Sequence, residues 1–405
     1  MTDFNKQSEN NFIAQRIEND EQAIQAAEQV AEFALIKRQQ RDQQRQLPFD
    51  VIELFSQTGL GGIRIPKQYG GAEVSNTTLA NVFRILSKAD ANIGLIPQNQ
   101  ISLLNMINIM GNDSQKRFIF GEILSGKRLA NGGPERYTKD SKTLATTLTI
   151  DNGNYYLDGE KFYSTGSSFA DYLAIKALHP DGHVVLAIVN KAAKGIEVVD
   201  DWDGFGLRTT SSGTVKLNHV KVIPELTFDE RLLSNAPTYR GAYSQLIQTA
   251  IDVGIAEAAF EDTLAVAKKA RPIADANVEA ARFEPYLLQE VGKLKVLLDA
   301  AILLLQEAAA YLDELDGLDF VTAEEAALAS IKVAEAKVYA NDAALTISEK
   351  LFELGGSRSS LSEHGLDQHW RNARVHTLHD PVRWKLHALG DYYLNHKLPN
   401  RHAWI

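Results

Sequence analysis

The spacing of apolar residues changes twice along this chain and divides it into three regions. Before residue 125, apolar residues recur every three or four positions, which is the period of an amphipathic helix. Breakers such as Pro48 separate these helical segments. The predicted helices are Asn10–Gln46, Phe49–Gln57, a helix capped by Ser75 that ends near Ala89, Ile93–Met110 and Gln115–Leu124.

A different pattern begins after Asn131-Gly132-Gly133-Pro134. Short β-branched runs alternate with polar residues and are bounded by turn residues, as in antiparallel strands. The Asn-Gly pair within Asp151–Asn154 predicts a tight hairpin. The pattern therefore predicts a small antiparallel sandwich or barrel. Its strands are Thr143–Ile150, Tyr155–Thr165, Tyr172–Ala177, Val184–Val189, Gly195–Val199 and Thr214–Val222.

The helical pattern returns after Pro224 and predicts an antiparallel bundle. Thr322 and Glu325 form a capping box, and Gly355-Gly356 is a helix stop. The fold class is α+β, with an N-terminal helical domain (1–129), a central antiparallel β domain (130–226) and a C-terminal four-helix bundle (227–405). The predicted bundle helices are Tyr243–Ala270, Glu284–Glu314, Thr322–Leu354 and Pro381–Lys397.

Composition narrows the classes of function. The net charge of −10 and the lack of a basic block disfavour nucleic acid as a partner. The absence of cysteine excludes disulfides and thiolate chemistry. The polar residues Met1–Asn11 are unlike a signal peptide, and no apolar run is long enough to cross a membrane. We therefore expect a cytoplasmic protein without a membrane partner.

The candidate chemistry lies near the C-terminus, where seven of the ten histidines follow residue 360. His376, His379 and Asp380 fall within five residues. Imidazole changes its charge near neutral pH, so this cluster is a candidate for proton transfer. A purely structural role is the alternative for Asp380, because an Asp followed by a Pro, here Pro381, is typical of a helix N-cap and first turn. That alternative does not explain two histidines just before a helix N-terminus.

Three segments together resemble the acyl-CoA dehydrogenase superfamily. They are Gly159–Asp171, Gly204–Val222, and the segment from Gly355-Gly356 to Trp370-Arg371-Asn372-Ala373-Arg374-Val375. Each segment is a weak signal by itself, but the three together, in this order and spacing, are a strong one. The resemblance covers nearly the whole chain. In many of these dehydrogenases, a Glu lies five residues beyond that last valine and removes the substrate α-proton. This chain has Asp380 at that position, preceded by His379.

The residues around Asp380 point to one branch of that superfamily. Pro381-Val382 replaces the Gly-Thr that follows the dehydrogenase Glu. His-Thr-Leu-His-Asp-Pro-Val resembles flavin-dependent monooxygenases such as dibenzothiophene monooxygenase. Those enzymes use reduced FMN from a separate reductase. Gln100, a candidate substrate-binding residue, departs from the histidine that this branch tends to have.

The resemblance also implies a set of cofactor-binding residues. Tyr163, Ser164 and Thr165 would face the N5 edge of the flavin, and Asn131 matches a flavin-contacting position of the monooxygenases. Arg271 would contact the cofactor phosphate of a neighbouring subunit, and the glycines Gly355 and Gly356 would allow the backbone close to the cofactor. Each residue also has a purely local explanation: a β-turn, a turn before glycines, a charge at a helix end and a helix stop.

Within the histidine cluster, His379 is the first candidate for the catalytic group. In a monooxygenase, its imidazole would hold a flavin C4a-hydroperoxide by a hydrogen bond and slow its decay. His376 would orient His379 or contact substrate, or it is an ordinary core histidine. Alternatively, His376, His379 and Asp380 are a two-histidine, one-carboxylate iron site. The flavin resemblance already accounts for this loop, so no metal is expected.

These observations give three hypotheses for the function. The leading one is a two-component monooxygenase that uses FMNH2 and oxygen to oxidise a small or aromatic organosulfur compound. Because no Gly-rich dinucleotide motif occurs in the chain, an NAD(P)H-dependent flavin reductase is the expected partner. The alternatives are an FAD-dependent acyl-CoA dehydrogenase with Asp380 as base, and a non-catalytic flavin-binding oligomer. Apolar positions on two faces of the long bundle helices, with the resemblance, predict a homotetramer.

Overall fold

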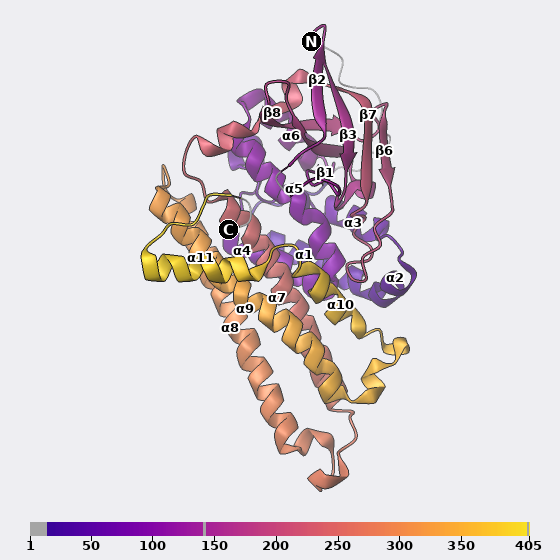
Figure 1. The fold of residues 1–405 in the computed structure, drawn as a ribbon. Helices are drawn as coiled ribbons and strands as arrows, with labels where there is room; N and C mark the ends of the chain where they lie inside the picture. Colours follow the sequence, from indigo (N-terminus) through magenta and orange to yellow (C-terminus); the bar gives the residue numbers. More distant parts are fainter. Residues whose placement is uncertain (1–13, 141–142, 403–404) are drawn as a thin grey trace.

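The computed structural model describes residues 14–140, 143–402 and 405, and its strands and helices separate by region (Figure 1). The strands gather at the top of that view, the longest helices extend downwards, and most N-terminal helices lie between them. None of the described helices is long and apolar enough to cross a bilayer. The α+β fold class with its three regions is confirmed.

The N-terminal region is helical, as predicted, with one broken element. The expected helix over Asn10–Gln46 begins only at Asp20, after Asn19, which caps it, and is two helices that meet at Lys37, whose backbone leaves the helical conformation. The change of direction lets the buried Arg41 reach Asp90, at 3.2 Å. Residues 10–13 lie outside the described residues. The helices are α1 (Asp20–Ile36), α2 (Arg38–Gln44), α3 (Phe49–Gln57), α4 (Asn76–Ala89, capped by Ser75), α5 (Ala91–Met110) and α6 (Asp113–Leu124).

The β region is one mixed sheet, in the order β6-β7-β3-β2-β4-β5-β8, with β1 beside β4. The prediction of a purely antiparallel domain was wrong, because β4 pairs in parallel with both β1 and β2. β1 and β8 were not predicted: β1 ends in the turn-forming pair Asn131-Gly132, and β8 has only three residues. The strands are β1 (Leu129–Gly132), β2 (Thr147–Asp151), β3 (Asn154–Lys161), β4 (Tyr172–Leu178), β5 (Val184–Asn190), β6 (Ile196–Val199), β7 (Thr214–Val222) and β8 (Thr227–Asp229).

Two turns of this sheet follow directly from residue type. The predicted hairpin pairs Asp151 with Asn154, and both turn residues have positive φ, as Asn-Gly favours. The strand expected to reach Thr165 ends at Lys161, because the chain turns at Tyr163, which has a φ of 57°. Beyond this early turn the chain reaches α5, where Gly166 lies next to Ile96.

The C-terminal region contains α7, α8 and α9 packed side by side, with α10 and α11 against α9. The capping box at Thr322 and the stop at Gly355-Gly356 are both present. α10 was not predicted, so the histidine-rich segment expected to be a loop is helical up to His376. The helices are α7 (Arg240–Ala267), α8 (Pro285–Asp316), α9 (Ala323–Gly355), α10 (Asp367–His376) and α11 (Val382–Asn395).

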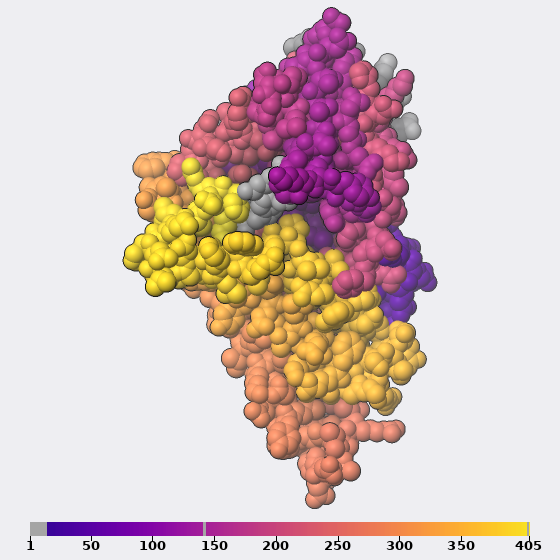
Figure 2. All heavy atoms as spheres, in the orientation of Figure 1, coloured from indigo at the N-terminus to yellow at the C-terminus, as the bar shows by residue number. Residues whose placement is uncertain are grey.

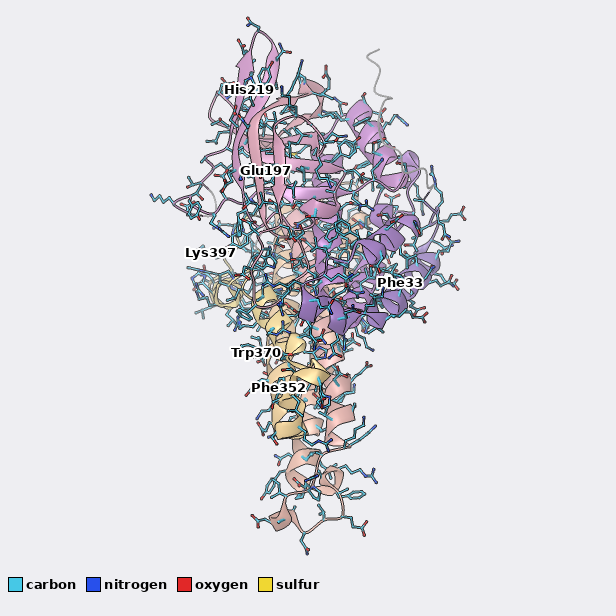
Figure 3. All side chains as sticks on the ribbon, turned by 90° about the vertical axis from the view of Figure 1, so that its right-hand side faces the viewer. Phe33, Glu197, His219, Phe352, Trp370 and Lys397 are labelled. Atoms are coloured by element: carbon cyan, nitrogen blue, oxygen red, sulfur yellow. The ribbon has the colours of Figure 1, made fainter. Side chains whose placement is uncertain are left out.

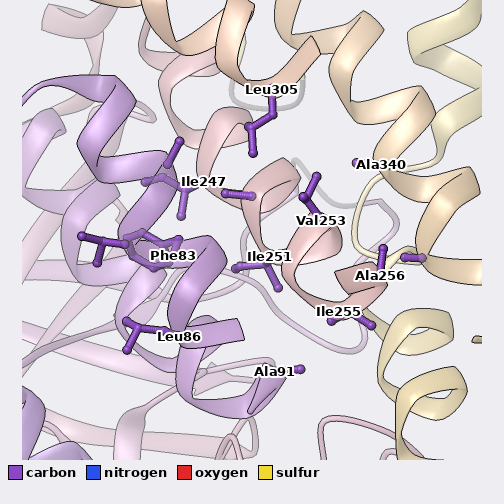
Figure 4. Close-up of a cluster of buried hydrophobic side chains, with 14 of the residues drawn as sticks. Phe83, Leu86, Ala91, Ile247, Ile251, Val253, Ile255, Ala256, Leu305 and Ala340 are labelled. Atoms are coloured by element: carbon purple, nitrogen blue, oxygen red, sulfur yellow. The ribbon is translucent and has the colours of Figure 1, made fainter. Parts of the chain in front are cut away.

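One hydrophobic core joins the N-terminal helices to the bundle. Figure 4 shows Phe83 and Leu86 of α4 beside Ile247 and Ile251 of α7. Small residues such as Ala340 on α9 let α7 and α9 approach closely. The shared core fixes α7 against α5 and α10, and these three helices carry much of the site described next.

Candidate active site

A cavity of about 980 Å³ lies where the β region meets the helices. Loops of the β region form one side, α5 and α7 another, and the segment from α10 to the C-terminus a third. Figure 2 shows the magenta and pink β region directly above the yellow C-terminal segment on this face. In the view turned by 90° (Figure 3), Lys397, a lining residue, lies at the same junction, above Trp370 and Phe352.

The three sequence segments that carry the family resemblance meet at this cavity. The backbone N–H of Leu207 donates to the side-chain oxygen of Asn372 at 2.7 Å. Gly206 passes so close to α10 that an added Cβ would lie 2.0 Å from the carbonyl oxygen of Arg371. The N–H of Gly166 donates to the carbonyl oxygen of Thr210 at 2.9 Å. Residues far apart in sequence therefore form one continuous wall.

Hydroxyl groups line the β side of the cavity. Thr165 and Thr210 both hydrogen-bond the hydroxyl of Ser212, at 2.8 and 2.7 Å. Ser164 does not line the cavity: it is fully buried, and its hydroxyl has no hydrogen-bond partner among the described residues. Tyr163 is half-exposed and lines the cavity beside Trp202, with ring centroids 6.1 Å apart. This side thus presents an aromatic surface next to a row of hydroxyls.

His379 and Asp380 lie in the short connection between α10 and α11 and both line the cavity. The prediction that Asp380 is an N-cap was wrong: Pro381 occupies the cap position of α11 and no side chain caps it. The carboxylate of Asp380 is buried and accepts instead from Gln245 at 2.8 Å. It also contacts Nδ1 of His379 at 3.0 Å, whereas the His379 side chain is 49% exposed.

The protonation of this pair follows from its surroundings. Burial alone would raise the pKa of Asp380. The proximity of His379, Lys337 and Lys385 outweighs burial, so the pKa of this carboxyl lies well below its ordinary value. A carboxylate can only accept, so Nδ1–H of His379 donates to it. Nε2 of His379 is then the ring nitrogen left to exchange a proton within the cavity.

A buried network of charged side chains lies next to the His379–Asp380 pair. Lys337 of α9 contacts Asp252 of α7 at 2.6 Å, with both side chains almost fully buried. Lys385 of α11 is also buried, and burial lowers its pKa to about 8 against the opposing effect of Asp380. Two lysines therefore offset two carboxylates at the junction of these helices, which keeps a buried polar cluster electrically balanced.

His376 belongs to this network. Its Nδ1 lies 2.5 Å from Asp252 and its Nε2 lies 2.7 Å from Gln248. Burial lowers its pKa, although Asp252 opposes the shift. His376 is buried and is one of the residues that line the cavity. Both ring nitrogens face α7 partners, so His376 does not hydrogen-bond His379 and supports the site from within the core.

The iron alternative does not fit this arrangement. A two-histidine, one-carboxylate site needs open ligand atoms from all three side chains. Asp252 and Gln248 already occupy both nitrogens of His376. Among the described residues, His376, His379 and Asp380 do not form a group that could hold a metal.

The two remaining polar candidates near the cavity differ in position. Asn131, in β1, lines the cavity. The amide of Gln100 is buried outside the lining, where it donates to the carbonyl of Gly61 and accepts from the N–H of Leu129, both at 2.9 Å. Gln100 therefore ties α5 to the start of β1. Its neighbours on α5, Gln98 and Asn99, are the ones that line the cavity.

Arg271, Gly355 and Gly356 lie elsewhere. Arg271 is exposed in the connection after α7. Gly355 ends α9 close to Val266, near the same end of α7. None of the three lines this cavity. Within one chain, these three residues are therefore separate from the cavity that His379 lines.

Several residues of the site were not predicted from the sequence. Trp202 and Trp384 line the cavity, and Gln245, Gln248 and Asp252 connect it to the core. The last three are spaced three and four residues apart along α7, so they share one face of this largely buried helix. That polar stripe was a signal in the sequence, since a buried helix carries such residues only where they have partners.

Comparison with known proteins covers nearly the whole chain. Residues 18–127, 135–220 and 246–384 match the acyl-CoA dehydrogenase N-terminal, middle and C-terminal domains, respectively. The dibenzothiophene monooxygenase of Mycolicibacterium goodii is 29% identical over 357 residues, which is 84% of this chain and 86% of that protein. A probable FMNH2-dependent monooxygenase of Pseudomonas putida, SfnC, is 28% identical over 366 residues, 89% of this chain and 91% of its own.

A solved structure gives the same result for the fold. The crystal structure of FMN-bound TdsC from Paenibacillus sp. A11-2 matches with a TM-score of 0.89 and 28% identity. The match covers 95% of this chain and 100% of that one. The likeness therefore extends over all three regions rather than one domain.

Proposed function

We infer the function of this chain from its family: it belongs to the acyl-CoA dehydrogenase family, in the branch of flavin-dependent monooxygenases. We propose that it uses reduced FMN and oxygen to oxidise an organosulfur compound, as the names of its relatives suggest. One observation carries the assignment of the site. A half-exposed imidazole, His379, lines the cavity and is held by a buried carboxylate, Asp380.

The cavity fits FMN in size and in the groups that it offers. Its volume of about 980 Å³ is ample for a cofactor and a small substrate. Tyr163 and Trp202 offer a surface for a planar ring, while Thr165 and Asn131 offer hydrogen bonds to its polar edge. Ser164, between Tyr163 and Thr165 in sequence, is fully buried and does not line the cavity. Reduced FMN, when bound, supplies the electrons that activate oxygen.

The chain contributes proton control and a dry environment. Asp380 fixes His379 so that Nε2 can hold a proton for, or accept one from, a group in the cavity. Apolar residues of the lining, including Leu95, Leu207 and Val375, exclude water and strengthen polar contacts inside. Trp384 and Leu378 extend this apolar lining beside His379. His379 is thus the catalytic residue, and Asp380 positions it.

The dehydrogenase alternative would make Asp380 the base. Asp380 lines the cavity, but it is nearly fully buried, and one of its carboxylate oxygens, Oδ2, accepts from Gln245 and contacts His379. The other oxygen, Oδ1, is buried without a hydrogen-bond partner among the described residues. A base must reach the proton that it removes, and the more exposed His379 is better placed to do so. The hypothesis of lost catalysis rested on Gln100 alone. Because that amide binds two backbone groups, its presence does not argue against activity.

The partner, assembly and location of the protein complete the proposal. A separate NAD(P)H-dependent flavin reductase would supply the reduced FMN in the cytoplasm. Arg271 and Gly355-Gly356 lie away from this chain's cavity, so a flavin phosphate contact there requires a neighbouring subunit in a homotetramer. Exposed apolar side chains on the bundle support association. Examples are Tyr286, Val296, Leu303 and Leu394.

The test combines the purified protein with FMN, NADH, a flavin reductase and labelled oxygen. We expect one labelled oxygen atom in the product of an organosulfur probe such as dibenzothiophene or a small dialkyl sulfide. Omission of the reductase should abolish the product. Product formation from NADH and FMN without reductase would contradict the two-component proposal. Tightly bound FAD with oxidation of an acyl-CoA would establish the dehydrogenase instead, and a monomer by light scattering would remove the role of Arg271.

A further inference from the structure

The turn between β4 and β5 brings together two histidines and a carboxylate outside the cavity. Its sequence is His179-Pro180-Asp181-Gly182-His183. Each of His179, Asp181 and His183 offers one ligand atom, and the three atoms lie within 4.8 Å of one another. No other such group occurs among residues 14–140, 143–402 and 405. Residues 179–183 do not line the cavity, so this cluster is separate from the proposed active site.

The contacts within the turn bring the three side chains together and leave one imidazole nitrogen without a partner among the residues described. The backbone N–H of Asp181 donates to Nδ1 of His179 at 3.3 Å, a long hydrogen bond that a metal on Nδ1 would replace. The other ring nitrogen of His179, Nε2, is the alternative ligand atom. A carboxylate oxygen of Asp181 lies 3.3 Å from Nδ1 of His179. Nδ1 of His183 is buried and has no hydrogen-bond partner within the described part of the chain. Buried polar atoms normally have partners, so this nitrogen needs an explanation.

The surroundings allow a cation to enter and be held. The His179 and His183 side chains are mostly buried and their ring centroids are 4.4 Å apart. The Asp181 side chain is 78% exposed, which leaves a path from solvent. On the other side, the carboxylate of Asp229 in β8 lies 4.0 Å from Nε2 of His183 and is also bound by Arg231. Two carboxylates and one arginine leave this region net negative when the imidazoles are neutral.

We propose that this turn binds one divalent transition-metal ion, with Zn²⁺ as the best match, through His179, Asp181 and His183. Two imidazoles and a carboxylate are a ligand set that Zn²⁺ accepts, with water completing the coordination. The ion would satisfy the buried nitrogen of His183 and fix the tip of the β4–β5 hairpin. Because β5 pairs with β8, this would stabilise one edge of the sheet. The proposal is independent of the monooxygenase function.

The experiment is a calorimetric titration of the full chain with Zn²⁺ after treatment with a chelator. We expect one site per chain and a higher melting temperature with the metal, because an ion bound to the folded state stabilises it. His179→Gln and His183→Gln should each weaken binding about tenfold or more and remove the thermal shift. Asp181→Asn should also weaken binding, and this exposed position can change without disturbing the core.

Two control variants separate this site from other histidines. His364→Gln removes an exposed histidine that lies 3.8 Å from Glu363, so it tests for adventitious binding by a single His–carboxylate pair. His379→Gln tests for binding in the cavity. Both should bind Zn²⁺ like the original chain. If His379→Gln abolishes binding, or if His183→Gln and Asp181→Asn leave it unchanged, the proposal is wrong. The cluster would then hold only hydrogen bonds and ion pairs.

Discussion

Replacing Asp380 with Asn tests the arrangement of the active site most directly. The side chain keeps its shape but loses the charge that fixes Nδ1–H of His379 and offsets Lys385. Asn can present either an acceptor or a donor to the ring, so the tautomer of His379 is no longer fixed. We expect product formation to fall about 100-fold or more, which is the usual contribution of a positioned acid or base. Stability should fall by about 3 kcal/mol, because a buried charge network loses one member.

A double-mutant cycle gives this prediction its sharpest form. If Asp380 acts through His379, then Asp380→Asn should add no further loss of product formation to His379→Ala. The loss of stability should remain in both backgrounds, since it arises from the lysines rather than from His379. Asp367→Asn is the matched control, because it removes an exposed carboxylate from α10 that pairs with Arg371.

The assay measures labelled product, oxygen consumption and urea unfolding for each variant. The control should keep product formation within about twofold, as exposed charges contribute little. An Asp380→Asn enzyme with full product formation would refute the positioning role. So would losses that add fully in the double variant, because Asp380 would then act independently of His379.

Four further outcomes are expected. His379→Ala should keep its fold and flavin binding while product formation falls about 100-fold, with the consumed oxygen recovered as hydrogen peroxide; a fully coupled variant would exclude this residue. Gln100→Ala should destabilise the chain by about 2 kcal/mol through two buried backbone groups that lose their partner, and a specific rise in KM without destabilisation would instead make it a substrate ligand. Lys337→Met should cost about 3 kcal/mol or more in urea unfolding because it leaves Asp252 buried without its lysine, and a neutral result would contradict that charge balance. Stability should decrease as pH falls below about 4, because the pKa of Asp380 is lowered in the folded state and the unfolded chain then binds more protons. Melting temperatures of Asp380→Asn should fall less over that pH range than those of the original chain.

The sequence by itself determined the elements that depend on local patterns. The periods of apolar residues located the three regions, and caps such as Ser75 and Thr322 marked helix starts within a residue. The Asn-Gly hairpin was also predictable, because it depends on φ preferences of two adjacent residues. The family resemblance then predicted site residues. Four of them, Asn131, Tyr163, Thr165 and His379, line one cavity.

Only the tertiary structure decided which partner each polar group has. An Asp before a proline has the pattern of an N-cap, yet the packing of α7 against the α10–α11 connection offers Asp380 the amide of Gln245 instead. Gln100 was a candidate substrate ligand, but its amide binds the backbone of Gly61 and of Leu129 at the start of β1. Helix or strand periodicity and turn type depend on residues that are neighbours in sequence, so the sequence alone predicts them. Gln245, Gly61 and Leu129 are 29 to 135 residues away in sequence from the side chains they bind and become their neighbours only when the helices and sheet pack.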